Sequence, residues 1–134
     1  VYGLCTRGES SIAVVQIGRK APYEYDLPGG GVEIDEDEAG ALMREFLEET
    51  GLTVWPNQVI GRAGQYWVAR GEPRNNLATF YEVELSAEDG EPSEPDHTLV
   101  WLSPAEALIK MRHEAHAWAI LHWLRARKAA GGQR

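Results

Sequence analysis

The chain has 134 residues, 43% of them hydrophobic and 25% charged, which is the size and composition of one average globular domain. Its 13 basic and 21 acidic residues give a net charge of −8, which argues against a binding surface for duplex nucleic acid. The chain has no apolar run near the ~20 residues of a membrane span and no secretory signal pattern. We therefore expect one domain over residues 1–134, cytoplasmic and without a membrane partner.

The first half of the chain is predicted to form a hairpin, a glycine-rich loop and a helix. Apolar, β-branched stretches at 1–6 and 11–17 flank the turn Arg7-Gly8-Glu9-Ser10. The loop Pro28-Gly29-Gly30-Gly31 allows the backbone to approach another group closely. Asp35 is the expected helix N-cap, with Glu38 completing a capping box, and Gly51 is placed to end the helix. A spacing of 100° per residue predicts one apolar helix face, formed by Ala39, Leu42, Met43, Phe46, Leu47 and Thr50.

The second half is predicted to contain two or three strands and further helix. Residues 54–69 and 77–85 are rich in β-branched and aromatic types, 86–96 read as an acidic loop, and 98–102 as a short strand. Ser103-Pro104-Ala105-Glu106 begins a helical region that runs to about Lys128, with a break near His113. Strands separated by two helical segments predict an α/β fold, a mixed sheet with helices packed against it.

The last helical segment carries two features that we interpret conservatively. His113 and His116 are one turn apart but have no cysteine nearby, so an exposed face is expected rather than a zinc site. Four apolar residues point in nearly all directions, which indicates burial against the sheet and leaves a homodimer contact as an option; they are Trp118, Ile120, Leu121 and Trp123. Cys5, the single cysteine, agrees with a reducing compartment and is expected to be a small apolar strand residue.

A dense acidic cluster is predicted on the central helix. Residues 30–52 contain eight acids and one base, a net charge of 1 − 8 = −7. Glu45 precedes Glu48 and Glu49 by three and four positions, so the three carboxylates lie about one helical turn apart and repel one another. A solvated helix face would tolerate such a cluster, whereas a position beside a sheet calls for a counter-ion. Oxygen ligands at this density suit Mg²⁺ or Mn²⁺.

The full spacing of this segment resembles a known family. The segment consists of Gly30, five residues, Glu36, seven residues and then Arg44-Glu45-Phe46-Leu47-Glu48-Glu49-Thr50-Gly51-Leu52. This pattern is similar to the complete Nudix box. Both hydrophobic positions are filled, with Phe46 where an aliphatic residue is more common in the family. The resemblance implies a Nudix-type α/β/α sandwich around a mixed sheet.

The resemblance also implies a role for each box residue. Glu45, Glu48, Glu49 and the Gly30 carbonyl would bind the divalent cation, Mg²⁺ or alternatively Mn²⁺. Arg44 would orient the acids, and independently its i, i+4 spacing from Glu48 favours an ion pair. Glu36 would support the site from outside the ligand set, and Gly51 would close the helix.

The implied activity is hydrolysis of a nucleoside diphosphate linked to a further group X, so the expected partner is a small nucleotide. A metal that neutralises the diphosphate and lowers the pKa of a bound water would make attack feasible for an acidic protein. Arg44, Glu45 and Glu48 are the expected catalytic residues within the box. For the general base, Glu48 competes with Glu94, Asp96 and His97 of the proline-bounded loop.

Substrate recognition is less constrained by the sequence. Tyr66 and Trp67 follow the box by about fifteen residues, where several Nudix subfamilies place a specificity residue, and adjacent strand residues point to opposite faces. Tyr66, Arg70, Arg74 and Asn76 are candidate substrate contacts, although loop solvation explains the polar ones equally well. Two other functions remain open: a non-catalytic nucleotide-binding Nudix sensor, and an isoprenoid diphosphate isomerase, which would need a catalytic cysteine that Cys5 fits poorly.

Overall fold

The computed structural model describes residues 1–132, with the backbone alone for Trp67 and Gly132. Its elements are β1 (Tyr2–Arg7), β2 (Ser11–Ile17), β3 (Glu24–Asp26), α1 (Glu38–Thr50), β4 (Thr53–Ala69), β5 (Glu72–Ala87), β6 (His97–Leu102), α2 (Pro104–Lys110) and α3 (Glu114–Gly132). The predicted N-terminal hairpin, the central helix and the short strand near residue 100 are confirmed. The short strand β3 was not predicted.

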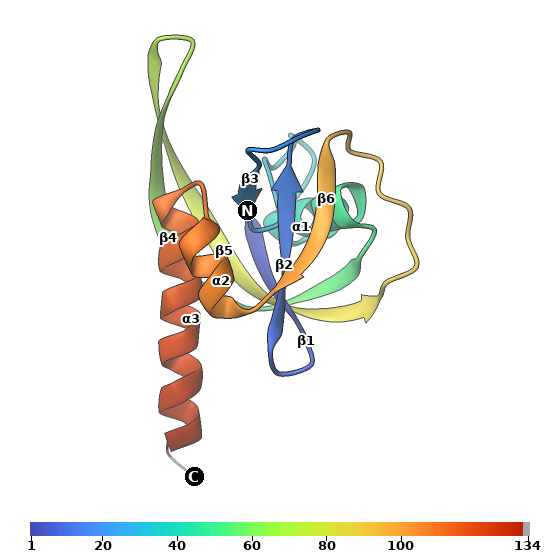
Figure 1. Cartoon of the computed structure of the whole chain (residues 1–134), viewed down its shortest axis with the longest axis vertical. Coiled ribbons are helices and arrows are strands. Elements are labelled where there is room, and N and C mark those ends of the chain that lie inside the picture. The colour runs from blue at the N-terminus through green and yellow to red at the C-terminus, as the bar shows by residue number, and fades with distance from the viewer. Residues whose placement is uncertain (133–134) are drawn as a thin grey trace.

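The strands form one mixed sheet, as predicted. Its order is β3-β2-β1-β5-β4, with β6 paired to β2 (Figure 1). β1 and β5 run parallel, whereas β2 runs antiparallel to β1, β3 and β6. In the part of the chain described, no helix combines the length and apolar character needed to cross a membrane.

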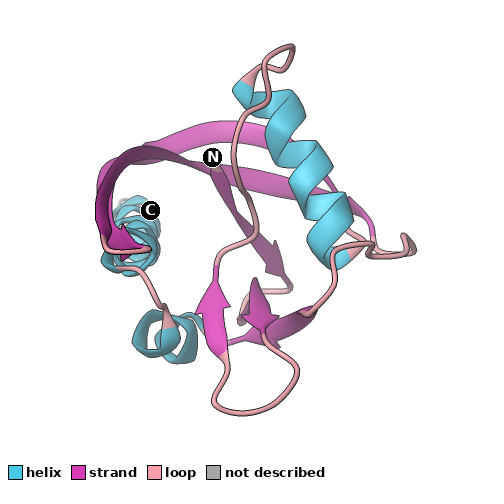
Figure 2. Ribbon diagram, turned by 90° about the horizontal axis from the view of Figure 1, so that it is seen from above, coloured by secondary structure: helices cyan, strands magenta, loops and turns pink. Residues whose placement is uncertain are grey.

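Each face of the sheet has its own hydrophobic core. Alternate strand residues point to opposite faces, so Leu4 and Val14 pack with α2 and α3, whereas Cys5 and Ala13 pack with α1. Figure 2 shows α1 on one side of the sheet and α3 on the other. This arrangement confirms the predicted α/β/α sandwich and places the acidic helix against one face of the sheet.

The start of α1 differs from the prediction, whereas its end agrees with it. Asp37, not Asp35, is the N-cap, because its carboxylate accepts the Gly40 N–H at 2.7 Å. The preceding residues are held in a tight turn by a 3.0 Å bond from the Glu36 N–H to the Glu33 carbonyl. At the other end Gly51 adopts φ 74°, and its N–H bonds to the Leu47 carbonyl, so the predicted glycine cap is confirmed.

The buried face of α1 is rotated relative to the predicted stripe. Leu42, Phe46 and Thr50 are buried as expected, but Glu49 is buried as well, and Leu47 is 44% exposed. Ala41 is also fully buried. The rotation follows from packing, because Phe46 lies directly over Gly3, where an added Cβ would be 2.6 Å from its ring. Burial of Glu49 is therefore a consequence of how the helix docks on the sheet.

β4 and β5 form one long hairpin whose outer end projects beyond the rest of the molecule (Figure 1). The chain reverses at Arg70 and Gly71, which both have positive φ, at 53° and 77°. That pair of left-handed residues matches the right-handed twist of the flanking strands. The predicted second strand began at Leu77, but β5 starts at Glu72. The residues between are polar and of low strand propensity, and pairing with β4 through the tight turn holds them extended.

The C-terminal region contains two helices with the predicted break between them. The Ser103 side chain accepts the Glu106 N–H at 3.2 Å, which confirms the predicted cap of α2. α3 continues to Gly132 rather than ending near Lys128. Trp123 is buried, but Trp118 and Leu121 are each 38% exposed, so burial on all sides was wrong. The expectation of exposed histidines was also wrong for His116, which is completely buried between α3 and the sheet.

Candidate active site

Arg44, in the middle of α1, is the centre of an ion-pair network. Its Nε and Nη2 donate to the two carboxylate oxygens of Glu36 at 2.7 and 2.9 Å. Its Nη1 donates to Glu45 at 3.1 Å and to Glu48 at 3.2 Å, so the predicted i, i+4 pair is present. The hydrogen bond from Arg44 lowers the pKa of Glu36. Glu36 thus holds the guanidinium that in turn holds two of the predicted metal-binding carboxylates.

Glu49 faces the glycine loop and not the Arg44 network. Its carboxylate accepts the Gly29 N–H at 2.8 Å and lies 3.4 Å from Nε2 of His97. Gly29 has φ 150°, and a Cβ there would lie 2.1 Å from the Val1 carbonyl oxygen, so only glycine fits. Burial, together with the nearby acids led by Glu45, raises the pKa of Glu49 to about 8 against the opposing Gly29 hydrogen bond. The group is a buried carboxyl in a negative field.

The glycine loop also packs tightly on Glu45. A Cβ added to Gly30 would lie 2.6 Å from the carboxyl carbon of Glu45, so the backbone and the carboxylate are in direct contact. Burial raises the pKa of Glu45, partly offset by Arg44. The Gly30 carbonyl accepts the Val1 amino group at 2.8 Å. The structure therefore brings Gly30 and Glu45, two of the predicted ligands, together.

The acidic loop after β5 docks on the C-terminal end of α1. The N–H groups of Ser93 and Glu94 both bond to the Glu48 carbonyl, at 2.8 and 2.9 Å. The Glu94 carboxylate is close enough to Glu45 and Glu49 to raise the pKa of both. Asp96, in contrast, is paired with Arg19 at 2.9 Å. The loop thus places Glu94 beside the acidic cluster, while Asp96 is directed to another partner.

The donor chemistry of this cluster fits a divalent cation, although its present side-chain positions do not form a closed ligand set. Within residues 1–132, no three His, Cys, Asp or Glu side chains are arranged to hold a metal ion. The reason is visible in the contacts, since Glu45 and Glu48 face Arg44 and Glu49 faces Gly29. One guanidinium contacts four acids: Glu33, Glu36, Glu45 and Glu48. Excess negative charge on carboxylate oxygens is the environment that Mg²⁺ prefers.

The structure does not bring Arg70 and Arg74 to the acidic cluster. Arg70 lies in the hairpin turn, and Arg74 lies on β5, 3.7 Å from Glu72, rather than in a loop as expected. Both views show this end of the hairpin well apart from α1 (Figures 1 and 2). Asn76 is likewise on β5. Tyr66 is 69% exposed on β4, and the side chain of Trp67 lies outside the described residues.

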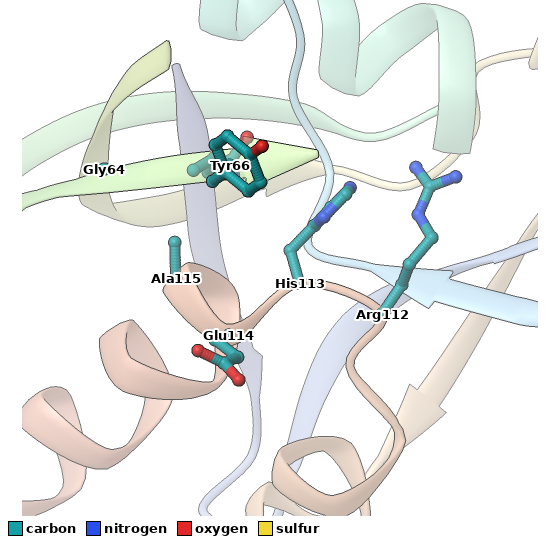
Figure 3. Close-up of a pocket in the computed structure, with 7 residues that line it drawn as sticks. Gly64, Tyr66, Arg112, His113, Glu114 and Ala115 are labelled. Atoms are coloured by element: carbon teal, nitrogen blue, oxygen red, sulfur yellow. The ribbon is translucent and has the colours of Figure 1, made fainter. Parts of the chain in front are cut away.

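A pocket that the sequence did not predict lies between β4 and the junction of α2 and α3. Its volume is about 420 Å³, and it is lined by Gly64, Gln65, Tyr66, Arg112, His113, Glu114 and Ala115 (Figure 3). Arg112 is held by Asp26 through bonds of 3.2 and 2.6 Å. Asp26 in turn raises the pKa of Glu49. Asp26 thus acts both on Arg112, which lines the pocket, and on Glu49 of the acidic cluster.

Sequence reasoning had only weak signals for this pocket. Strand alternation would have placed Gln65 and Tyr66 on opposite faces, and their burial differs accordingly, with Gln65 only 4% exposed. The inward face could not be chosen in advance, because β4 contains register irregularities at three places before Gln65. The partner of Arg112 could not be found either, since Asp26 is 86 residues away.

The cysteine cannot serve as an accessible nucleophile. Cys5 is fully buried in the core beneath α1, and burial raises the pKa of its thiol to about 12. The thiolate, which is the reactive form, is therefore absent at neutral pH. This agrees with the expected role of a small apolar strand residue.

Comparison with known proteins identifies the class that this fold and box define. The model of the NUDIX domain matches residues 1–124. The putative 8-oxo-dGTP diphosphatase 2 of Mycobacterium tuberculosis is 39% identical over 111 residues, 79% of this chain and 73% of that protein. The m7GpppN-mRNA hydrolase NUDT17 of Danio rerio is 41% identical over 91 residues, 62% of this chain but only 28% of that protein.

A solved structure supports the same fold. A NUDIX hydrolase from Nitrosomonas europaea superimposes with a TM-score of 0.79 at 20% identity, covering 93% of this chain and 86% of that one. The chain belongs to the Nudix family, as the box predicted. Members of this family generally use divalent cations such as Mg²⁺.

Proposed function

We propose that the chain, as a single domain over residues 1–134, is a Mg²⁺-dependent pyrophosphohydrolase. It would cleave a phosphoanhydride bond in a nucleoside diphosphate linked to X: a (deoxy)nucleoside triphosphate, a damaged nucleotide or a dinucleoside polyphosphate. The observation that carries the proposal is the packing of the glycine loop on Glu45 and Glu49, beside a single arginine that cannot neutralise the acids around it. The mycobacterial relative, named for a damaged nucleotide, supports the substrate class.

The proposed ligands of the cation, Mg²⁺ or alternatively Mn²⁺, are Glu45, Glu48, Glu49 and the Gly30 carbonyl. When bound, such a cation neutralises the diphosphate and lowers the pKa of a coordinated water. Because Arg44 now contacts Glu45 and Glu48, these carboxylates would have to exchange its guanidinium for the metal. Glu49 needs no such exchange, since its partners are a backbone N–H and His97.

Several residues are proposed to act on the ligands or on water rather than on the metal alone. Glu36 fixes Arg44 through a bidentate contact, so together they limit the positions open to the helix carboxylates. Glu48 and Glu94 are the proposed alternatives for the general base. Glu94 is positioned by its own backbone bond to the Glu48 carbonyl. Gly51, as the left-handed cap, ends the helix where this loop docks.

The proposal is tested by turnover of a nucleotide panel with and without Mg²⁺. Release of phosphate or pyrophosphate is measured for the native chain, for Glu48→Gln and for Glu84→Gln, which changes an exposed glutamate on β5. We expect metal-dependent turnover that Glu48→Gln reduces at least ~100-fold, while Glu84→Gln leaves it unchanged. Equal turnover by Glu48→Gln would remove Glu48 from the mechanism. Tight nucleotide binding without turnover across the panel would instead favour the non-catalytic sensor.

A further inference from the structure

The two carboxylate oxygens of Glu49 have different partners. Oε1 accepts the Gly29 N–H at 2.8 Å, and Oε2 lies 3.4 Å from Nε2 of His97. Both side chains are largely buried, with 11% of Glu49 and 19% of His97 exposed. A carboxylate offers about four acceptor positions, so these two contacts leave others for a cation. Gly29 and His97 therefore hold the carboxylate at both of its oxygens while it can still act as a ligand.

The ring of His97 is oriented by a second contact of its own. Its Nδ1 lies 2.8 Å from the Pro95 carbonyl oxygen. Because a carbonyl oxygen only accepts, this hydrogen bond places the hydrogen on Nδ1 and leaves Nε2 for the contact with Glu49. Both ring nitrogens thus face protein oxygens, which is the arrangement of a side chain that positions another group.

The backbone before His97 is itself anchored. Asp96 has φ 64°, a left-handed conformation that is uncommon outside glycine but tolerated by aspartate. Its carbonyl accepts the Gly18 N–H and its carboxylate accepts the Arg19 Nε–H, each at 2.9 Å. His97 then begins β6 and pairs with Ile17 of β2. The end of β2 and the two residues after it thus fix His97 on the sheet, independently of α1.

We propose that His97 is a positioning residue for the metal site: it holds the Glu49 carboxylate through Oε2 and thereby increases the affinity of the site for a divalent cation. A ligand held in one orientation loses less conformational freedom when the cation binds, and partners behind metal ligands commonly change the affinity by about 10- to 100-fold. This inference rests on the proposed function, because it assumes that Glu49 is a ligand. It replaces the role of general base, for which the sequence made His97 a candidate, with a role that acts through Glu49.

The first experiment measures Mn²⁺ binding to the full chain by electron paramagnetic resonance, without nucleotide and at one pH. His97→Asn keeps a nitrogen near the position of Nδ1, so it retains the Pro95 contact but does not reach Glu49. His97→Gln places an uncharged N–H near the position of Nε2 and so restores the contact with Oε2. We expect His97→Asn to bind Mn²⁺ about 10- to 100-fold more weakly than the native chain, and His97→Gln to stay within about 3-fold of it. The matched control His122→Asn, which changes an exposed histidine on α3, should bind as the native chain does.

Turnover separates a positioning residue from a general base. If His97 acts through the affinity for the cation, His97→Asn should need more Mg²⁺ for half-maximal turnover but regain most of the native kcat at saturating Mg²⁺. Loss of a general base would instead lower kcat by about 100-fold or more at every Mg²⁺ concentration. A defect in kcat that saturating Mg²⁺ does not relieve overturns the inference.

The outcomes of Mn²⁺ binding distinguish this inference from the proposed function. Equal affinity of the native chain and His97→Asn overturns the role of His97, even if metal-dependent hydrolysis is found. Equally weak binding by His97→Asn and His97→Gln also overturns it, because the loss is then not due to the Oε2 contact. Weak binding by His97→Asn alone, together with no turnover of any nucleotide, supports the inference while refuting the hydrolase. Absence of Mn²⁺ binding by the native chain overturns the inference together with the ligand set.

A measurement on the native chain covers the case in which His97→Asn does not fold. The ¹⁵N resonance of His97 Nε2 should then shift when Mg²⁺ is added, because its partner Glu49 binds the cation, whereas the ring resonances of His122 should stay in place. An unchanged His97 resonance overturns the inference.

Discussion

Neutral His116 should make the stability of the protein fall steeply in mild acid. Its Nδ1 accepts the Leu27 N–H at 3.0 Å, and its ring packs on Tyr2 and Phe80 with centroid distances of 4.3 and 5.4 Å. The proton therefore sits on Nε2, which has no partner among the described residues. Burial, helped by nearby positive charge, lowers the pKa of His116 to about 3. A second proton would have to bind Nδ1, which already accepts the Leu27 N–H.

The sign and size of the effect follow from linkage. Between about pH 3 and 6.5 the unfolded chain binds a proton at this histidine and the folded chain does not, so the free energy of unfolding falls as the pH drops. The pKa difference corresponds to about 1.4 kcal/mol per pH unit and, over the whole interval, to an upper limit of about 4 to 5 kcal/mol. That is comparable with a large share of the stability of a small domain.

Urea denaturation at several pH values compares the native chain with His116→Asn. The asparagine oxygen is placed to keep accepting the Leu27 N–H, but the side chain cannot titrate. We expect His116→Asn to be less stable at pH 7 by about 2 kcal/mol through lost ring packing, and to lose less stability between pH 6.5 and 4. The exposed histidine variant His122→Asn should keep the native slope. Parallel curves for native chain and His116→Asn would refute the reasoning.

Three further predictions concern the helix and its glycines. Gly30→Ala should lower turnover ~10- to 100-fold, because the added Cβ displaces the Glu45 carboxylate. Gly31→Ala should leave turnover unchanged, since a Cβ there meets open space. Turnover rates test both variants, and circular dichroism checks that they fold. Gly51→Ala should cost more than ~1 kcal/mol of unfolding free energy, since φ is 74° and a Cβ would lie 2.3 Å from a carbonyl oxygen, while Gly40→Ala should cost little. Near pH 9 and with a chelator present, Glu49→Gln should be more stable than the native chain by a few kcal/mol. The folded carboxyl keeps its proton up to about pH 8 and the unfolded one only to about 4.5, so native stability falls as the pH rises through that window.

The parts of the site that local sequence determines were predictable. Helix caps formed by Asp, Ser or a left-handed glycine depend on a few neighbouring residues, so a local pattern predicts them. The observed ends of α1 and the observed start of α2 lie within two residues of the predicted positions. The Arg44–Glu48 pair follows from helix geometry alone, since residues four apart are neighbours on any α-helix. The continuous apolar runs of β1 and β2 likewise agree with a sheet that is covered on both faces.

The parts that depend on docking were not predictable. Glu49 is buried because Phe46 fits over Gly3, a contact between residues 43 positions apart that no helical pattern encodes. The spacing of Glu45, Glu48 and Glu49 suggests one shared solvated helix face. Docking of α1 on the sheet instead directs the Glu49 carboxylate toward the Gly29 N–H. The sequence thus indicated which acids cluster, and tertiary packing decided how deeply each of them is buried.

The hairpin shows why substrate contacts were the hardest to predict. Arginines near an acidic motif are reasonable phosphate ligands on charge alone, but β4 and β5 are 17 and 16 residues long, and this length carries Arg70 away from the motif. Strand length was decided by the turn, because two positive-φ residues let polar residues 72–76 pair with β4 instead of forming a loop. The same pairing sets the inward register of Gln65, a residue with no charge and no motif. The burial of Gln65 is therefore visible only once the strand that carries it is placed against the start of α3.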